Sequence, residues 1–199
     1  ILNRGVCLSN PFVPAISSAS IRSKSRREVA YTGLEAVREL RYPTLMVSVF
    51  DFVNPSGVFL KEGQECINNR ISAAECLALP GNLTLYLDSG GYELTKFGIK
   101  TWYDALDVYA IQQILRGEVW TILDYPARGK RKREIARAIA SNLQFAQQVC
   151  TLHRGPARLM AVAHGSNSRE LYNVASKLLS LREISIIAVS DKELPLAQT

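Results

Sequence analysis

The sequence predicts a parallel α/β fold, namely a TIM (β/α)8-type barrel of which this chain carries about six βα units. Short apolar runs rich in β-branched residues alternate with longer stretches of helical periodicity. These runs are apolar at nearly every position, which is typical of parallel strands covered on both faces. The first run is not followed by the glycine-rich phosphate turn of an open dinucleotide-binding sheet, so the barrel is favoured over the open sheet.

Six strands and five helices are expected, in near alternation along the chain. The strands read FVPAIS (12–17), TLMVSVFDF (44–52), LTLYLDS (83–89), VWTILDY (119–125), ARLMAVAHG (157–165) and ISIIAVS (184–190). The helices are predicted over residues 32–40, 67–79, 101–116, 131–152 and 168–181. Thr101 and Ser168 are expected to cap the starts of the third and fifth helices, the latter with Glu170 nearby.

Length and composition predict a single domain over residues 1–199. With 199 residues and 47% hydrophobic content, the chain can bury one sizeable core. A complete barrel of eight units takes about 250 residues, so we expect the barrel to be truncated at its C-terminal end. No apolar run approaches the roughly 18 residues of a membrane span, and no signal-peptide pattern opens the chain. A soluble, cytoplasmic protein without a membrane partner is expected.

The four cysteines are scattered, with no CxxC pair and no histidines at metal-ligand spacing. We therefore expect reduced thiols, no metal and no cofactor.

Positive charge is concentrated in two segments. The formal charge is +6, and the segments are IRSKSRR (21–27) and ARGKRKREIARAIA (127–140). The second segment lies where a loop becomes a helix, so its cations either form a solvated helix start or contact the phosphates of a nucleic acid. The candidate phosphate-binding residues are Arg128, Lys130, Arg131, Lys132 and Arg133.

Polar residues end four successive predicted strands. The carboxyl ends of parallel strands converge at one mouth, where active sites of such folds lie. Each residue also has an ordinary explanation: an aspartate can initiate a turn, and a histidine at a strand end can be satisfied by its neighbours. The residues are Asp88, Asp124, His164 with Gly165, and Ser190 with Asp191.

The segment LDSGGYEL (87–94) resembles the DSGG(F/Y)Q motif of the tRNA-guanine transglycosylase family, barrel enzymes that exchange a guanine in a polynucleotide for a free 7-deazaguanine. Further segments are similar to the family in the same order. TILDYPARGKRKREIARAIASNLQFAQQV resembles its aspartate-containing strand end and long helix. LMAVAHGSNSRELYNVASKLLSL resembles its GI(V/Q)QGG strand and helix, and ISIIAVSDKEL its GLAVGE strand. The likeness covers about residues 12 to 194, and only the DSGG segment is specific by itself.

The resemblance implies roles for these positions. Asp88 would be the catalytic carboxylate that transfers a proton near the sugar and the departing base. Asp124 would grip the base edge, since an acceptor-only group suits the adjacent ring N–H and amine of guanine. His164 stands where the family has glutamine and would bond the base carbonyl. The remaining substrate-binding positions are Ser89, Gly90, Gly91, Tyr92 and Gly165.

The sequence also departs from the family. The nucleophilic aspartate and the zinc module are not seen in this chain, and Glu93 replaces the glutamine after the aromatic residue. Three functions therefore remain open: a tRNA-guanine transglycosylase of the queuosine tRNA-modification type, a relative that acts on DNA, and a non-catalytic barrel that binds nucleic acid or a subunit. A homodimer or heterodimer is compatible with each.

Overall fold

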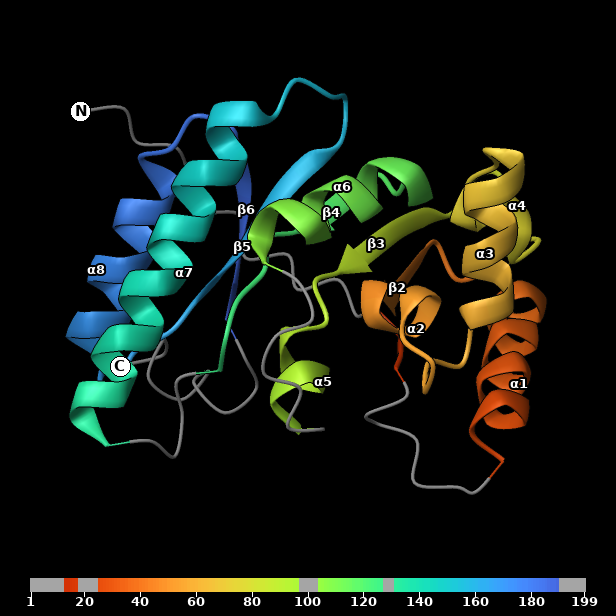
Figure 1. The fold of residues 1–199 in the computed structure, drawn as a ribbon, viewed down its shortest axis with the longest axis horizontal. Coiled ribbons are helices and arrows are strands. Elements are labelled where there is room, and N and C mark those ends of the chain that lie inside the picture. The colour runs from red at the N-terminus through yellow and green to blue at the C-terminus, as the bar shows by residue number, and fades with distance from the viewer. Residues whose placement is uncertain (1–12, 18–24, 97–103, 127–130, 190–199) are drawn as a thin grey trace.

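The computed structural model describes residues 13–17, 25–96, 104–126 and 131–189, which form a six-stranded parallel sheet with helices between the strands (Figure 1). The strand order is β1-β2-β3-β4-β5-β6, so each strand pairs with its neighbour in sequence. A parallel sheet in sequential order is the wall of a β/α barrel opened between its first and last strands. The predicted α/β class is confirmed, and the six parallel strands with the helices between them are compatible with part of a barrel.

The elements have the following bounds. The strands are β1 (Ala15–Ile16), β2 (Thr44–Ser48), β3 (Thr84–Asp88), β4 (Val119–Thr121), β5 (Arg158–Ala163) and β6 (Ile184–Val189). The helices are α1 (Arg26–Glu39), α2 (Val49–Val53), α3 (Leu60–Asn69), α4 (Ala73–Cys76), α5 (Gly91–Lys96), α6 (Ala105–Leu115), α7 (Lys132–Leu152) and α8 (Ser168–Leu179).

Two predicted elements have wrong boundaries. In the first, an apolar run did not distinguish a buried helix from a strand. The run at 44–52 is a strand only as far as Ser48, after which α2 begins with buried Val49 and Phe50. The helix predicted at 67–79 is two helices. Arg70 ends α3 with a φ of 55°, and the Ser72–Glu75 capping box starts α4.

Other helix starts also differ from the prediction. The helix α1 begins at Arg26 rather than at residue 32, and α5 was not predicted. The N-cap of α8 is Asn167, whose side chain accepts from the backbone N–H of Glu170, rather than Ser168. Asp104 caps α6 with its own capping box, and Thr101 lies outside the described residues.

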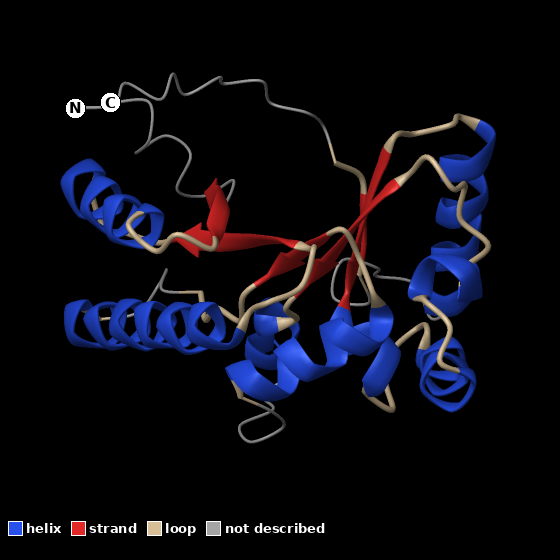
Figure 2. Ribbon diagram, turned by 90° about the horizontal axis from the view of Figure 1, so that it is seen from above, coloured by secondary structure: helices blue, strands red, loops and turns tan. Residues whose placement is uncertain are grey.

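The sheet has a helix-covered face and an inner face. Leu45 and Val47 of β2, and Leu85 and Leu87 of β3, are fully buried. The residues between them along each strand are only partly buried, because successive side chains point to opposite faces. Figure 2 shows the long helices arranged along one side of the curved sheet. None of the described helices has the length and apolar character that a membrane span requires.

Candidate active site at the carboxyl ends of the strands

Asp88 is the last residue of β3 and begins the turn into α5. Its Oδ2 accepts a hydrogen bond from the backbone N–H of Gly90 at 3.1 Å. Gly90 has a φ of 79°, a left-handed conformation that favours glycine. Gly90 therefore lets the chain turn sharply behind the carboxylate.

The environment of Asp88 favours its protonated form. Burial, followed by the negative charges of Glu93 and Asp124, raises the pKa of Asp88 to about 7. Hydrogen bonds from the backbone of Gly90 and Ser89 oppose this rise in pKa. A carboxyl group with a pKa near neutrality can both donate and accept a proton, as acid–base catalysis requires.

Asp124 follows β4 and is held by side chains from two neighbouring strand ends. Its Oδ2 lies 2.8 Å from Nε2 of His164, and its Oδ1 accepts from Ser89 Oγ at 3.4 Å. The side chains of His164 and Asp124 are 5% and 16% exposed, respectively. The predicted residues after β3, β4 and β5 therefore meet at one place, and Asp124 keeps a small exposed surface.

Gly91 brings the ends of β3 and β4 into backbone contact. A Cβ atom added at this position would lie 1.8 Å from the carbonyl oxygen of Asp124, so only glycine fits. The N–H of Gly91 also donates to Ser89 Oγ at 3.4 Å. Close backbone packing thus fixes the distance between the Asp88 turn and the Asp124 loop.

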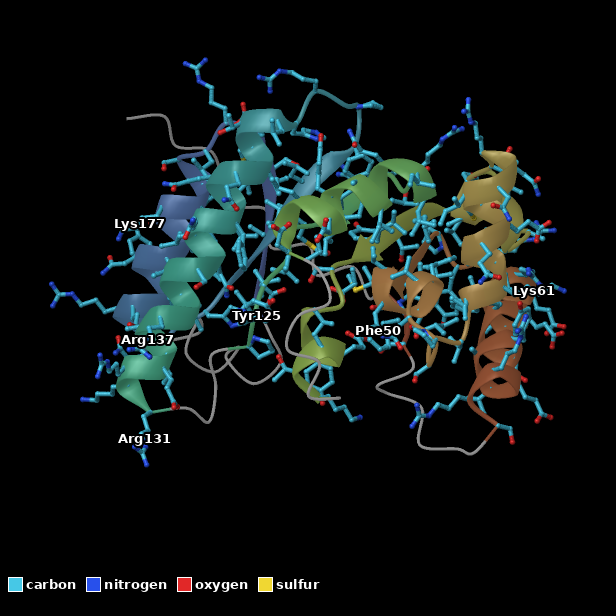
Figure 3. All side chains as sticks on the ribbon, in the orientation of Figure 1. Phe50, Lys61, Tyr125, Arg131, Arg137 and Lys177 are labelled. Atoms are coloured by element: carbon cyan, nitrogen blue, oxygen red, sulfur yellow. The ribbon has the colours of Figure 1, made fainter. Side chains whose placement is uncertain are left out.

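Two helices hold these strand ends from behind. Asn142 of α7 clamps the residue after Asp124: its Oδ1 accepts from the N–H of Tyr125 at 2.9 Å, and its Nδ2 donates to the Tyr125 carbonyl at 3.1 Å. Gln112 of α6 is buried, and its Nε2 donates to the carbonyls of Leu87 at 3.1 Å and Thr121 at 2.9 Å. Tyr125 is partly buried, and Figure 3 labels it beside α7.

The surroundings of Asp88, from β1 to the end of β4, contain buried polar atoms with unused hydrogen-bonding capacity. Ser17, just after β1, donates to Oε1 of Glu93 in α5. Oε2 of Glu93 is buried and has no hydrogen-bond partner in the described part of the chain. The same holds for the hydroxyl oxygens of Ser48 and Thr121.

The strand register places these hydroxyls around Asp88. Ser48 pairs directly with Asp88 between β2 and β3. Leu87 pairs with Trp120, and continuing that register places Thr121 beside Asp88 on the other side. Paired residues of adjacent strands share a face, so both hydroxyls lie on the inner face with the carboxylate.

The other predicted site residues lie at the edge of this cluster. Tyr92 is 48% exposed on α5, with Lys96 Nζ 5.9 Å from its ring centre. Gly165 is buried against α8, where an added Cβ would lie 2.5 Å from the backbone nitrogen of Leu171. His164 uses Nε2 for Asp124, so its described role is to orient that carboxylate.

The predicted basic residues are described only in part. Arg131, Lys132 and Arg133 are exposed at the start of α7, whereas Arg128 and Lys130 lie outside the described residues. Figure 3 shows Arg131 and Arg137 projecting outward from α7. The start of this helix lies at the same end of the molecule as the carboxyl ends of the strands (Figure 1).

In the earlier basic segment, Arg27 is bound at 2.7 Å to Glu62 of α3. This ion pair joins α1 to α3, so the guanidinium of Arg27 contributes to helix packing.

No protein-family model matches the chain, and no curated protein is significantly similar to it. The functional assignment therefore depends on the residues and their geometry.

Several residues of the cluster were not predicted as site residues. Glu93 was noted only as a departure from the family motif, and Ser48 lay within a predicted strand. Gln112 and Asn142 could have been suspected, because each is a polar residue on a helix face that is otherwise apolar. Their partners are main-chain atoms, which no side-chain motif reveals.

Proposed function

We propose that the chain exchanges guanine in a polynucleotide, with tRNA favoured, for a free 7-deazaguanine base. The observation that supports this proposal is the meeting of two carboxylates, Asp88 and Asp124, with different environments at one mouth. The first is partly buried and has a pKa near neutrality, and the second is bonded to two side-chain donors. Such a difference between neighbouring carboxylates is how proteins divide acid–base work from substrate binding.

The chemistry of base exchange requires this division. Breaking an N-glycosidic bond develops positive charge on the sugar carbon and negative charge on the departing base. Protonated Asp88 would donate its proton to that base, and the ionised form would take one from the incoming base. A pKa of about 7 populates both forms at neutral pH.

Asp124 would bind the base edge. A carboxylate oxygen can accept more than one hydrogen bond, so the bonds from Ser89 and His164 leave capacity for the ring N–H and amine of guanine. These two bonds fix the orientation of the carboxylate before a base arrives. The proposal therefore treats His164 and Ser89 as positioning residues for Asp124.

The position of α7 supports a nucleic-acid substrate. The exposed cations of its first turn and the positive end of its dipole lie at the same end of the molecule as the mouth. A flipped nucleotide entering the mouth would bring its flanking phosphates toward them. The same proposal includes a (β/α)8-type barrel of which this chain carries about six units, because the described strands are parallel and sequential.

The test is incorporation of tritiated guanine into tRNA, and in parallel into double-stranded DNA, measured as acid-precipitable radioactivity. We expect incorporation into tRNA, and a loss of about a hundredfold or more in Asp88→Asn and in Asp124→Asn. Glu65→Gln, at an exposed position of α3, is the control and should retain the wild-type rate. Incorporation into DNA alone would establish the DNA-acting alternative. Binding of either polymer without incorporation would establish a non-catalytic nucleic-acid-binding protein.

A further inference from the structure

Glu93 is a buried carboxylate with one unused oxygen beside the proposed reaction centre. The residue is 2% exposed and lies in the first turn of α5. Ser17 donates to its Oε1, whereas its Oε2 is buried with no hydrogen-bond partner among the described residues. Buried polar atoms of proteins are nearly always bonded, so an unpartnered oxygen beside the proposed reaction centre is available to a ligand there.

The location of Glu93 assigns it to the Asp88 side of the mouth. Its charge acts on Asp88 more strongly than the charge of Asp124 does. Its partner Ser17 directly follows β1, and Ser48 of β2 pairs with Asp88 in the sheet. The unused oxygen therefore belongs to the ends of β1, β2 and β3, away from the contact between Asp124 and His164.

The chemistry of this side requires a ligand with a hydroxyl donor. A carboxylate oxygen such as Oε2 accepts hydrogen bonds, and the Ser48 hydroxyl, also unpartnered in the described structure, can donate or accept. A group that both donates and accepts, such as an alcohol, can bond to Oε2 of Glu93 and to the Ser48 hydroxyl. If Asp88 meets the sugar and Asp124 the base, the group that reaches Glu93 is a sugar hydroxyl.

We propose that Glu93 accepts a hydrogen bond from the 2′-hydroxyl of the reacting nucleotide and thereby selects RNA over DNA. This inference rests on the proposed function. Within a polynucleotide the 3′ and 5′ oxygens are esterified, so the 2′-hydroxyl is the free donor of the sugar. Glu93 is then a specificity-determining residue, which reads the sugar while Asp124 reads the base.

The test compares two probes that differ at one atom. One is an RNA stem-loop with a single unpaired guanosine in its loop, and the other carries 2′-deoxyguanosine at that position. We expect the wild-type protein to bind the first about tenfold more tightly by fluorescence anisotropy, the usual effect of one hydrogen bond to a charged group. In Glu93→Leu, which fills similar space without an acceptor, the ratio should fall to about one.

Two further variants control the experiment. In Glu93→Gln the Ser17 hydroxyl holds the amide oxygen, and the amide nitrogen that replaces Oε2 cannot accept, so the ratio should also fall. Glu62→Gln is the matched control, because Glu62 is another buried glutamate with an unpartnered Oε2, but it is bonded to α1. Its ratio should stay near tenfold. The readout is a ratio within each variant, so a lower folded fraction does not change it.

The outcomes separate the two proposals. Equal affinity of the wild-type protein for both probes, or a tenfold preference that persists in Glu93→Leu and Glu93→Gln, would overturn the role of Glu93 and leave base exchange standing. Absence of binding to either probe would overturn both.

Discussion

The two sides of the mouth differ in how their polar atoms are satisfied. On the β4 and β5 side, both oxygens of Asp124 have partners, and Asn142 fixes the backbone of the next residue. On the β1 to β3 side, Oε2 of Glu93 and the Ser48 hydroxyl have none among the described residues. The Asp124 carboxylate is thus satisfied without a ligand, whereas the Glu93 oxygen and the hydroxyls that flank Asp88, including that of Thr121 at the end of β4, are not.

This difference indicates how the site divides its work. A satisfied, fixed carboxylate is suited to recognition, because its orientation does not change when the ligand binds. Unpartnered buried atoms cost about 1–3 kcal/mol each in the free protein, and a ligand that supplies the missing bonds recovers that cost on binding. The stability of the free protein is thus lowered on the side where Asp88 lies.

The largest expected effect on stability comes from disrupting the backbone contact between Gly91 and Asp124, which joins the two sides of the mouth. In Gly91→Ala the new methyl group would overlap the carbonyl oxygen of Asp124, and neither backbone can move without disturbing its strand end. We expect a loss of about 3 kcal/mol in the free energy of unfolding, measured by urea denaturation.

Gly81→Ala is the matched control. Nothing lies within 4 Å of a Cβ atom added at Gly81, so its free energy of unfolding should change by less than about 0.5 kcal/mol. Equal stability of the two variants would show that the Asp88 turn and the Asp124 loop are not tightly packed.

The second effect is a pH dependence of stability caused by the raised pKa of Asp88, to which the charges of Glu93 and Asp124 contribute. Its pKa is about 7 in the folded chain and about 3.9 in the unfolded chain, so between these values the folded state binds more protons. The stability that this group contributes is full below about pH 4 and is lost as the pH rises through 7. In Asp88→Asn that loss is absent. The free energy of unfolding of the variant, relative to that of the wild type, should therefore rise by about 2 kcal/mol between pH 5 and pH 8.

Glu170→Gln provides a comparison of opposite sign. Hydrogen bonds from the Ser166 side chain and backbone lower the pKa of Glu170, so its contribution is present above about pH 4.3 and is lost as the pH falls further. The stability difference between this variant and wild type should stay constant between pH 5 and pH 8. A constant difference for Asp88→Asn over the same range would contradict a shielded Asp88.

The order and type of the main elements were predictable from the sequence, because apolar strands and periodic helices leave distinct patterns. All six strands and four of the five predicted helices lie where the periodicity indicated, with shifted ends, whereas the helix predicted at 67–79 is the end of α3 and the separate helix α4. The short helices α2 and α5 were not predictable. α2 is buried nearly all round and lacks a polar face, and α5 follows the glycine turn directly.

For the site, the sequence predicted the polar residues at the ends of the strands. It did not predict the helix residues that hold these strand ends in place. Asp88, Asp124 and His164 could be grouped because parallel strands end at one edge. The support from Asn142 and Gln112 depends on helices that lie far along the chain and bond main-chain atoms. The unused oxygen of Glu93 is a property of packing, which a sequence motif does not contain.

The third effect concerns the clamp on the β4 and β5 side. In Asn142→Ala the N–H and the carbonyl of Tyr125 both lose their side-chain partner. We expect a loss of about 1.5 kcal/mol in the free energy of unfolding, since partly buried main-chain groups are left unpaired. Asn173→Ala, at an exposed position of α8, should change it by less than about 0.5 kcal/mol. If both variants were equally stable, the Tyr125 clamp would contribute nothing to holding Asp124.

The smallest effect tests whether Asp124 needs a donor or only a neighbour that fills space. His164→Leu removes the donor 2.8 Å from Oδ2 while keeping much of the buried volume, and should lower the free energy of unfolding by about 1 kcal/mol. His164→Gln retains a donor of similar reach, so its loss should be at most about half as large. Because Ser89 remains bonded to Oδ1 in both variants, the difference between them isolates the bond to Oδ2. If His164→Leu were as stable as His164→Gln, the Asp124 side would be held by packing, and the contrast with the unpartnered Glu93 side would lose its basis in hydrogen bonding.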